Sequence, residues 1–317
     1  MSDPQPEWRP SGRVPDPAVV VIDESFAPYR LPLAKVERLA TGMRWAEGPV
    51  CLGDTRTLVW SDVPGNAMWR WDEETKTSFP FRRPCGHSNG NTRDRQGRLV
   101  TCEHHGRRVV RTEHDGRLTV LAERVDGKRL NSPNDVVCKS DGSIWFTDPA
   151  FGLLSNYEGE KAEQELPTNV YRIDASGAMS VVAEGINQPN GLAFSPDESI
   201  LYIVESRAVP RTLLAYDVVG GKTLANRRLF IDAGPKGTPD GFRVDVDGNL
   251  WCGWGMGEAG LDGVHVFNPK GKLIGRIDLP ERCANVCFGG RYRNRLFMAA
   301  SHSLYALYVN TQGVAGG

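Results

Sequence analysis

Six oxygen-bearing side chains stand at equivalent places in a pattern that recurs along this chain of 317 residues. Each precedes the Leu or Ile anchor of a short hydrophobic run, such as TLVWSD or SIWFTD, by ten or eleven residues. These side chains belong to Glu47, Asn89, Asn134, Asn190, Asp240 and Asn285. Carboxylates and carboxamides, without His or Cys, are the ligand types that hard cations such as Ca²⁺ prefer. The pattern therefore predicts a site for a divalent cation.

The spacing of these six positions is typical of a four-stranded propeller blade. Successive positions are 42, 45, 56, 50 and 45 residues apart, which is the range of periods found in propeller repeats. Within each repeat, short runs rich in Val, Ile, Tyr and Trp alternate with Asp-Gly or Asn-Pro turns, as in antiparallel hairpins. We therefore expect an all-β protein, a six-bladed β-propeller, in which equivalent residues of the six blades face one central channel.

The ends of the repeated region predict how the ring closes. The chain ends after the third strand of the sixth repeat, and the segment AKVERLATG near the N-terminus matches a fourth strand. We expect this N-terminal strand to complete the last blade, because doing so removes an open sheet edge. Residues 1–30 are predicted to form an arm and residues 31–317 a single propeller domain. The polar insertion at residues 149–168 is a candidate lid or rim loop.

Composition and charge argue against several classes of partner. The formal net charge is -1 and no basic cluster is interleaved with aromatic residues, so a nucleic-acid partner is not expected. Apolar runs stay well short of the ~20 residues of a membrane span, and the Pro-rich N-terminus lacks the apolar stretch of a signal peptide. We therefore expect no membrane partner and a cytoplasmic location. The seven cysteines form no CxxC pair, which predicts free, mostly buried thiols.

Several other polar residues are candidates for contacts with a substrate. The second strand of each repeat returns to the level of the repeated polar position, so the residues at its end, among them Asp148 and Glu205, are expected near the channel. His87 precedes Asn89 by two residues, and Arg129 lies in the segment GKRLNSPND. Both side chains carry donors that suit the oxygens of a small molecule.

Longer motifs resemble those of the senescence-marker-protein/gluconolactonase/luciferin-regenerating-enzyme family, and above all its bacterial gluconolactonases. They are RWAEGPV, EHHGRRVVR, GKRLNSPNDVVCKSDGSIWFTDPAFG, INQPNGLAFSPDE and GTPDGFRVDVDGNLW. The resemblance covers about residues 35–310 and implies a six-bladed propeller that holds one divalent cation, usually Ca²⁺, and acts mostly on sugar lactones. By position, the family's metal ligands fall on Glu47, Asn134, Asn190 and Asp240. Phe151 and the pair Glu205-Ser206 depart from the family's usual residues near the expected rim.

These observations combine into one hypothesis, a metal-dependent hydrolase that opens sugar lactones in carbohydrate metabolism. The cation would be Ca²⁺, with Zn²⁺, Mn²⁺ and Mg²⁺ as alternatives, and Asp240 would serve both as ligand and as general base. Substrate contacts are assigned to Asn89, Arg129, His87, Asp148 and Glu205. Two alternatives stay open. A calcium-dependent phosphotriesterase or other esterase would use a comparable Glu/Asn/Asn/Asp set, and a non-catalytic calcium-binding propeller would share the fold. The sequence does not indicate an oligomeric state.

Overall fold

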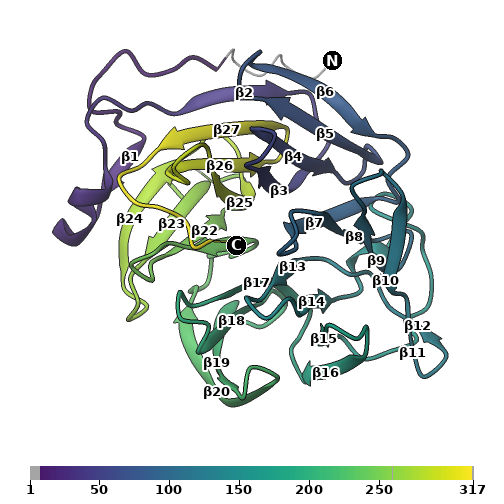
Figure 1. Ribbon diagram of the computed structural model, residues 1–317. Helices are drawn as coiled ribbons and strands as arrows, with labels where there is room; N and C mark the ends of the chain where they lie inside the picture. The colour runs from purple at the N-terminus through teal and green to yellow at the C-terminus, as the bar shows by residue number, and fades with distance from the viewer. Residues whose placement is uncertain (1–7, 259, 316–317) are drawn as a thin grey trace.

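Six antiparallel sheets surround one axis in the computed structural model, which describes residues 8–258 and 260–315 (Figure 1). The first three sheets contain β3 (Ala46–Leu52), β4 (Thr57–Asp62), β5 (Ala67–Asp72) and β6 (Thr77–Arg82); β7 (Ser88–Arg93), β8 (Leu99–Glu103), β9 (Arg108–Thr112) and β10 (Leu118–Ala122); and β13 (Val136–Cys138), β14 (Ile144–Asp148), β15 (Asn169–Ile173) and β16 (Met179–Ala183). A two-stranded hairpin, β11 (Arg124–Val125) and β12 (Lys128–Arg129), lies between the second and third sheets in sequence.

The remaining sheets follow the same order from the axis outward. They contain β17 (Pro189–Phe194), β18 (Ile200–Glu205), β19 (Thr212–Val219) and β20 (Thr223–Asp232); β21 (Phe242–Val244), β22 (Leu250–Trp254), β23 (Gly263–Phe267), β24 (Leu273–Asp278) and the added β1 (Val19–Val21); and β25 (Cys283–Gly289), β26 (Arg295–Ala300), β27 (Ser303–Tyr308) and β2 (Glu37–Thr41).

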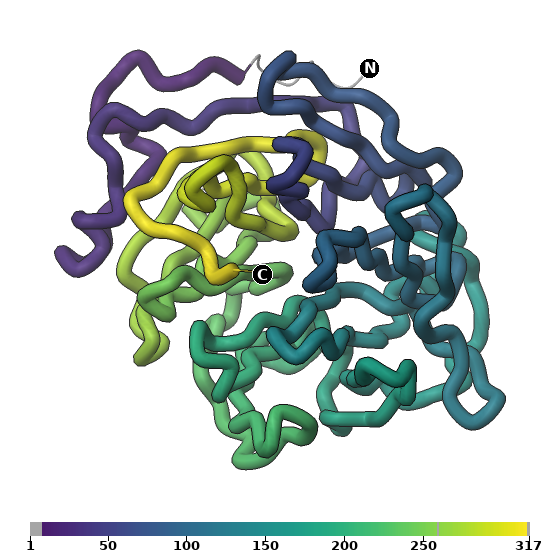
Figure 2. Tube along the Cα trace, viewed as in Figure 1, coloured from purple at the N-terminus to yellow at the C-terminus, as the bar shows by residue number. Residues whose placement is uncertain are grey.

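The innermost strands form a closed ring. β3 contacts β7, β7 contacts β13, and the contacts continue through β17, β21 and β25 back to β3. Figure 2 shows the chain passing once around this ring. Each blade begins at the axis with the strand that carries or follows a repeated polar residue, so these residues converge on the channel. The predicted six-bladed β-propeller is confirmed.

The N-terminal segment enters two blades. β2 pairs antiparallel with β27, with Glu37 opposite Ala306, and so completes the last blade as expected. β1 pairs with β24 as a fifth, outer strand, and the 3₁₀ helix η1 (Glu24–Tyr29) that follows it places Phe26 in the core. Much of the predicted arm is thus built into the propeller, whereas its first seven residues lie outside the described part of the chain.

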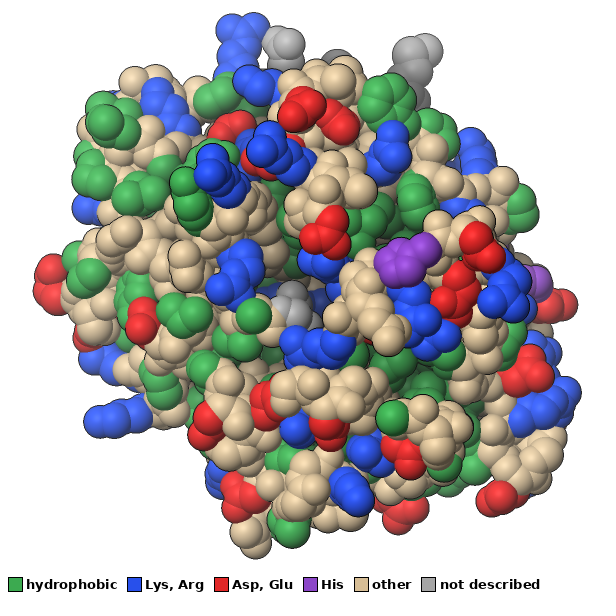
Figure 3. All heavy atoms as spheres, in the orientation of Figure 1, with side chains coloured by type: hydrophobic (Ala, Val, Ile, Leu, Met, Phe, Trp, Pro, Cys, Tyr) green, Lys and Arg blue, Asp and Glu red, His purple; other side chains and the backbone are tan. Residues whose placement is uncertain are grey.

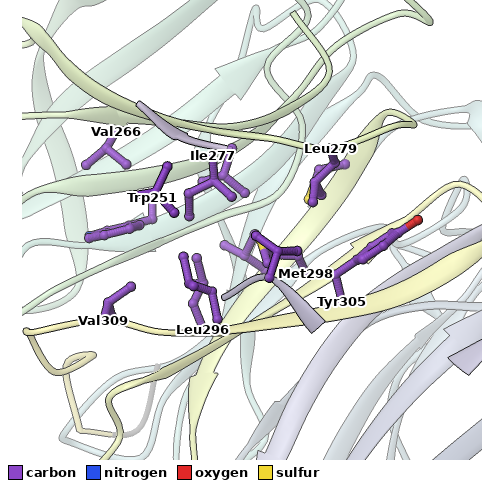
Figure 4. Close-up of a cluster of buried hydrophobic side chains, with 14 of the residues drawn as sticks. Trp251, Val266, Ile277, Leu279, Leu296, Met298, Tyr305 and Val309 are labelled. Carbon is purple, nitrogen blue, oxygen red and sulfur yellow. The ribbon is translucent and has the colours of Figure 1, made fainter. Parts of the chain in front are cut away.

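The core consists of apolar layers between neighbouring blades. Trp251 and Ile277 of the fifth blade pack against Leu296 and Met298 of the sixth, and none of the four side chains is exposed (Figure 4). Both faces of a middle strand are covered in this way, and all six residues of β4 are buried, including the polar Thr57, Ser61 and Asp62. The seven cysteines are free, as expected, and six of them are buried.

The C-terminal segment crosses one end of the channel. The amide of Val314 donates to the carbonyl of Val244 at the end of β21, and Arg95 Nη1 donates to the carbonyl of Ala315. Figure 3 shows this face of the ring, where basic side chains gather around the middle. The repeated polar residues lie at the opposite ends of the inner strands, so the candidate site opens on the other face. No helix in the described ranges is long and apolar enough to cross a membrane.

Candidate metal centre and active site

Five of the six repeated polar residues line one cavity of about 210 Å³. They are Glu47, Asn89, Asn134, Asn190 and Asp240, and each side chain is buried. The sixth, Asn285, lies beside this group, where its Nδ2 is 3.4 Å from Asp135 Oδ2. Residues separated by up to 193 positions in sequence, from Glu47 to Asp240, therefore meet at one end of the channel.

Glycine follows the polar residue in four of the six repeats and allows the inner strands to approach closely. The amide of Gly90 donates to the carbonyl of Asn134 at 2.7 Å, and a Cβ on Gly90 would lie 2.4 Å from that oxygen. A Cβ on Gly191 would lie 2.3 Å from the carbonyl oxygen of Asp240. Any larger residue would push these segments apart. The glycines thus fix the spacing of the polar side chains around the axis.

Carboxylates at the ends of the second strands hold the loops that lead into the site. Asp148 Oδ2 accepts from the amide of Asn131 at 2.8 Å, and Glu205 Oε1 accepts from the amide of Asn187 at 2.8 Å. Each donor lies three residues before a cavity residue, Asn134 or Asn190. These acids therefore position the backbone of the site, and neither lines the cavity.

The channel holds more negative than positive charge. Glu47, Asp135 and Asp240 are buried, and the cationic groups beside them are Arg282, whose Nη2 is 2.5 Å from Asp240 Oδ2, and Arg243, whose Nη1 is 3.8 Å from Asp135 Oδ2. Burial, with the nearby charges of Asp240 and Asp135, raises the pKa of Glu47 well above its usual value. Burial also raises the pKa of Asp240 despite its contact with Arg282. A bound cation would stabilise the ionised form of both acids.

The donor atoms fit a hard divalent cation. Asp240 Oδ1 is buried and has no hydrogen-bond partner among the described residues, which is a costly arrangement unless another group satisfies it. The described ranges contain no group of three or more His, Cys, Asp or Glu side chains able to hold a metal. A centre here would therefore use two carboxylates, from Glu47 and Asp240, together with the amide oxygens of Asn134 and Asn190, an all-oxygen set of the kind that Ca²⁺ accepts.

His104 orients two of the amides. Its Nδ1 lies 3.2 Å from the carbonyl of Glu158, which only accepts, so Nδ1 carries the proton and Nε2 is the acceptor. The Nδ2 groups of Asn89 and Asn134 lie 3.3 Å and 3.5 Å from Nε2. Burial lowers the pKa of His104 to about 4, which keeps the ring neutral. With their NH₂ groups turned to His104, both amides keep their oxygens available to the cavity.

Two other residues predicted to contact the substrate lie outside the cavity. Arg129 is on β12, and its Nη2 lies 3.2 Å from the carbonyl of Gly106. The Nδ1 of His87 is 2.9 Å from the carbonyl of Val63, and burial lowers the pKa of this histidine. Of the five predicted substrate contacts, the structure brings only Asn89 to the cavity wall.

Several cavity residues are not among the predicted metal ligands and substrate contacts, although Phe151 and Ser206 were expected near the rim. Trp45, Phe151, Glu158, Ser206, Arg207, Arg211, Pro239, Met256 and Arg282 complete the wall. Phe151 and Glu158 come from the insertion at 149–168, the candidate lid, so the position of that segment gave a usable signal. The arginines lie in non-repeated loop sequence, where no periodic pattern marks them.

A serine-nucleophile pattern in this region has no catalytic geometry. Residues 86–90 spell GxSxG, yet Ser88 lies on the antiparallel strand β7 and is fully buried. Its Oγ is 2.9 Å from Ser61 Oγ and 3.2 Å from Cys85 Sγ, with no histidine among its hydrogen-bond partners in the described ranges. The strand-turn-helix setting that exposes such a serine is absent here.

The chain is similar in sequence and in fold to several known proteins. Residues 45–302 match the family described as SMP-30/Gluconolactonase/LRE-like region. A gluconolactonase of Zymomonas mobilis is 30% identical over 301 residues, covering 88% of this chain and 82% of its own. A pentonolactonase of Haloferax volcanii is 28% identical, covering 87% and 84% of the two chains. The solved structure of a gluconolactonase of Xanthomonas campestris superposes with a TM-score of 0.85 at 37% identity, covering 95% and 99%.

Proposed function

The chain belongs to the SMP-30/Gluconolactonase/LRE-like family, and we propose that it is a hydrolase that opens sugar lactones with one divalent cation, Ca²⁺, at the channel end. The relatives named gluconolactonase and pentonolactonase support lactone hydrolysis as the reaction. The observation that carries the metal is the buried, unpartnered Oδ1 of Asp240 beside the buried carboxylate of Glu47 and two amides.

Glu47, Asn134, Asn190 and Asp240 would hold the cation. When bound, it would act as a Lewis acid that polarises the lactone carbonyl. Asn89 lies on the same wall and would donate to or accept from a sugar hydroxyl. Phe151 and Glu158 of the 149–168 segment line the cavity with these residues and would restrict the access of water to the bound ring.

Asp240 is the proposed general base. Its Oδ2 is held by Arg282, while Oδ1 has no hydrogen-bond partner in the described residues. The carboxylate would accept a proton from water as the water oxygen adds to the lactone carbonyl carbon. The ring C–O bond then breaks, and the same proton passes to the departing ring oxygen, which becomes a hydroxyl of the open-chain acid. Because a bound cation and Arg282 would both favour the ionised carboxylate, Asp240 would be a weak base, and the orientation of water against an already reactive lactone would supply much of the rate.

Removal and return of metal tests the proposal. Chelated protein, freed of chelator, would be assayed with gluconolactone in a pH-indicator assay, then titrated with Ca²⁺, Zn²⁺, Mn²⁺ and Mg²⁺. We expect turnover to disappear on chelation and to return with at least one of these ions, Ca²⁺ being the expected one. Undiminished turnover in metal-free protein would exclude a metal-dependent reaction.

A parallel panel separates the proposed lactonase from the other two hypotheses. Faster turnover of paraoxon or fluorophosphates than of any lactone would indicate a phosphotriesterase. Tight cation binding without turnover of lactones or phosphotriesters would indicate a non-catalytic calcium-binding propeller.

A further inference from the structure

We propose that Arg207, Arg211 and Arg282 bind a second, negatively charged group of the substrate, so that the preferred lactones carry a carboxylate or a phosphate besides the lactone ring. This inference rests on the proposed lactonase function. It concerns which sugar lactones the cavity selects, and it is argued from the position of these three side chains and from the unpaired charge of Arg207 and Arg211.

The arginines lie where the metal cavity meets a larger space. All three line the cavity that contains Glu47 and Asp240. Arg207 and Arg211, with Ser206, also line an adjoining cavity of about 590 Å³ formed largely by residues 206–211 and 232–235. A lactone ring held at Asp240 would therefore direct its remaining substituents past these guanidinium groups.

Much of this positive charge has no partner among the residues that the structure describes. Arg282 is held by Asp240 and lies over the ring of Trp45, 5.4 Å from its centroid. Arg211 uses Nε to donate to the carbonyl of Ser206 at 2.9 Å. In the described ranges its two Nη groups have no hydrogen bond or ion pair, and the side chain of Arg207 has none either.

The arginines are close enough to affect one another. Burial, followed by the positive charges of Arg282 and Arg207, lowers the pKa of Arg211. Placing like charges close together in a partly buried wall is unfavourable unless an anion binds between them. A bound anion would relieve this repulsion, and guanidinium groups match the two oxygens of a carboxylate or phosphate with paired hydrogen bonds.

Besides the proposed metal ligands Glu47 and Asp240, two further acids face the same space. Glu158 lines the inner cavity, where burial and the nearby charge of Asp240 raise its pKa. Asp232 lines the outer cavity, is exposed, and accepts through Oδ1 from the amide of Gly234 at 2.8 Å. Neither forms an ion pair with Arg207 or Arg211 in the described part of the chain. The charges of Arg207 and Arg211 therefore remain available to a bound anion.

The test compares neutral and anionic lactones at fixed ionic strength. kcat/KM would be measured for gluconolactone, which is neutral, for the lactone of glucaric acid, which adds a carboxylate, and for 6-phosphogluconolactone, which adds a phosphate. We expect the wild-type protein to prefer at least one anionic lactone, and the better of the two identifies the group. In the double variant Arg207→Gln/Arg211→Gln, the ratio of kcat/KM for that lactone to kcat/KM for gluconolactone should fall roughly tenfold or more.

Matched controls separate specific contact from general charge and from misfolding. Arg228→Gln removes an exposed arginine from the outer strand of the same blade, where it pairs with Asp217, and should leave the ratio unchanged. Arg207→Lys/Arg211→Lys should recover part of the preference. A wild-type preference for the neutral lactone would overturn the inference, as would an equal fall of the ratio in Arg228→Gln, and either outcome would leave lactone hydrolysis itself standing.

Calorimetry gives a second readout that does not depend on turnover. Glucarate, a dicarboxylate, should bind the wild-type protein more tightly than gluconate, a monocarboxylate, and the double Gln variant should lose this difference. If wild-type protein hydrolysed no lactone, the proposed function would fail, while tighter glucarate binding would still support the anion site. Equal binding of the two acids to wild-type and variant protein would reject that site.

Discussion

Arg282 and Asp240, 42 residues apart in sequence, are joined by a 2.5 Å hydrogen bond from Nη2 to Oδ2 at the wall of the central cavity. This contact fixes one oxygen of the carboxylate and leaves the other, Oδ1, buried without a partner among the described residues. The pair thus divides the two oxygens of one acid between a structural contact and a free coordination position.

Replacing Asp240 by Asn should remove cation binding while retaining the shape of the side chain. We expect cation affinity, measured by calorimetry, to fall on the order of 100-fold or more, because an ionised ligand is lost, and lactone turnover to fall with it. Asp217→Asn, which alters a carboxylate on β19 away from the cavity, should leave the affinity for the cation unchanged. Unaltered affinity in Asp240→Asn would place the metal elsewhere.

His104→Leu should weaken cation binding although His104 is not itself a proposed ligand. Loss of the Nε2 acceptor frees the Nδ2 groups of Asn89 and Asn134 and lets the amides rotate, for an expected 10- to 100-fold loss of affinity, as for other residues that orient ligands. His104→Gln offers a replacement acceptor and should recover part of the affinity in the same titration. If the Leu and Gln variants bound equally, the hydrogen bonds would not be the cause.

Cation binding should stabilise the fold. A ligand that binds only the native state at 100 times its Kd adds about 2.7 kcal/mol to the free energy of unfolding. Urea unfolding of wild-type protein, with chelator or with saturating Ca²⁺, should show a gain of this size, and Asp240→Asn should show little of it. A gain of the same size in both proteins would mean that the ion binds away from Asp240.

Gly191→Ala should destabilise the propeller and disturb the site together. The added Cβ would lie 2.3 Å from the carbonyl oxygen of Asp240, so the backbone of two neighbouring blades would have to shift. We expect a loss of about 1–3 kcal/mol in urea unfolding, accompanied by weaker cation binding. Gly53→Ala meets an arginine side chain at an ordinary 3.6 Å and serves as the control, with little change in either measurement.

Asp148 should make stability depend on pH. Burial raises its pKa in the folded protein to about 8, from an ordinary value of 3.8. Between those values the folded state holds a proton that the unfolded state has released, so stability falls as pH rises through this window, by up to about 1.4 kcal/mol per pH unit. Asp148→Asn keeps an acceptor for the amide of Asn131 and should flatten this slope in urea unfolding at several pH values with saturating cation. Asp126→Asn, at an exposed turn, should retain the wild-type slope.

The sequence predicted the ring and its closure because both depend on repetition. Glu47, Asn89, Asn134, Asn190 and Asp240 recur at one place in the repeat, and the propeller carries equivalent places to one axis. No periodic pattern indicates that Asp148 and Glu205 accept hydrogen bonds from backbone amides. None indicates that Glu158 and the three arginines extend into the cavity. These features depend on side-chain rotamers and on loops that differ from blade to blade.

The pairing of β2 with β27 determines when the sixth blade can be completed during synthesis of the chain. The sixth blade needs a strand from residues 37–41 and three strands that end at Tyr308, so β2 cannot be paired until the chain as far as Tyr308 has left the ribosome. Until then β2 has no native partner, and its exposed edge is open to pairing with other nascent chains. Translation speed and chaperone supply should therefore affect the yield of this protein more than they affect its final stability.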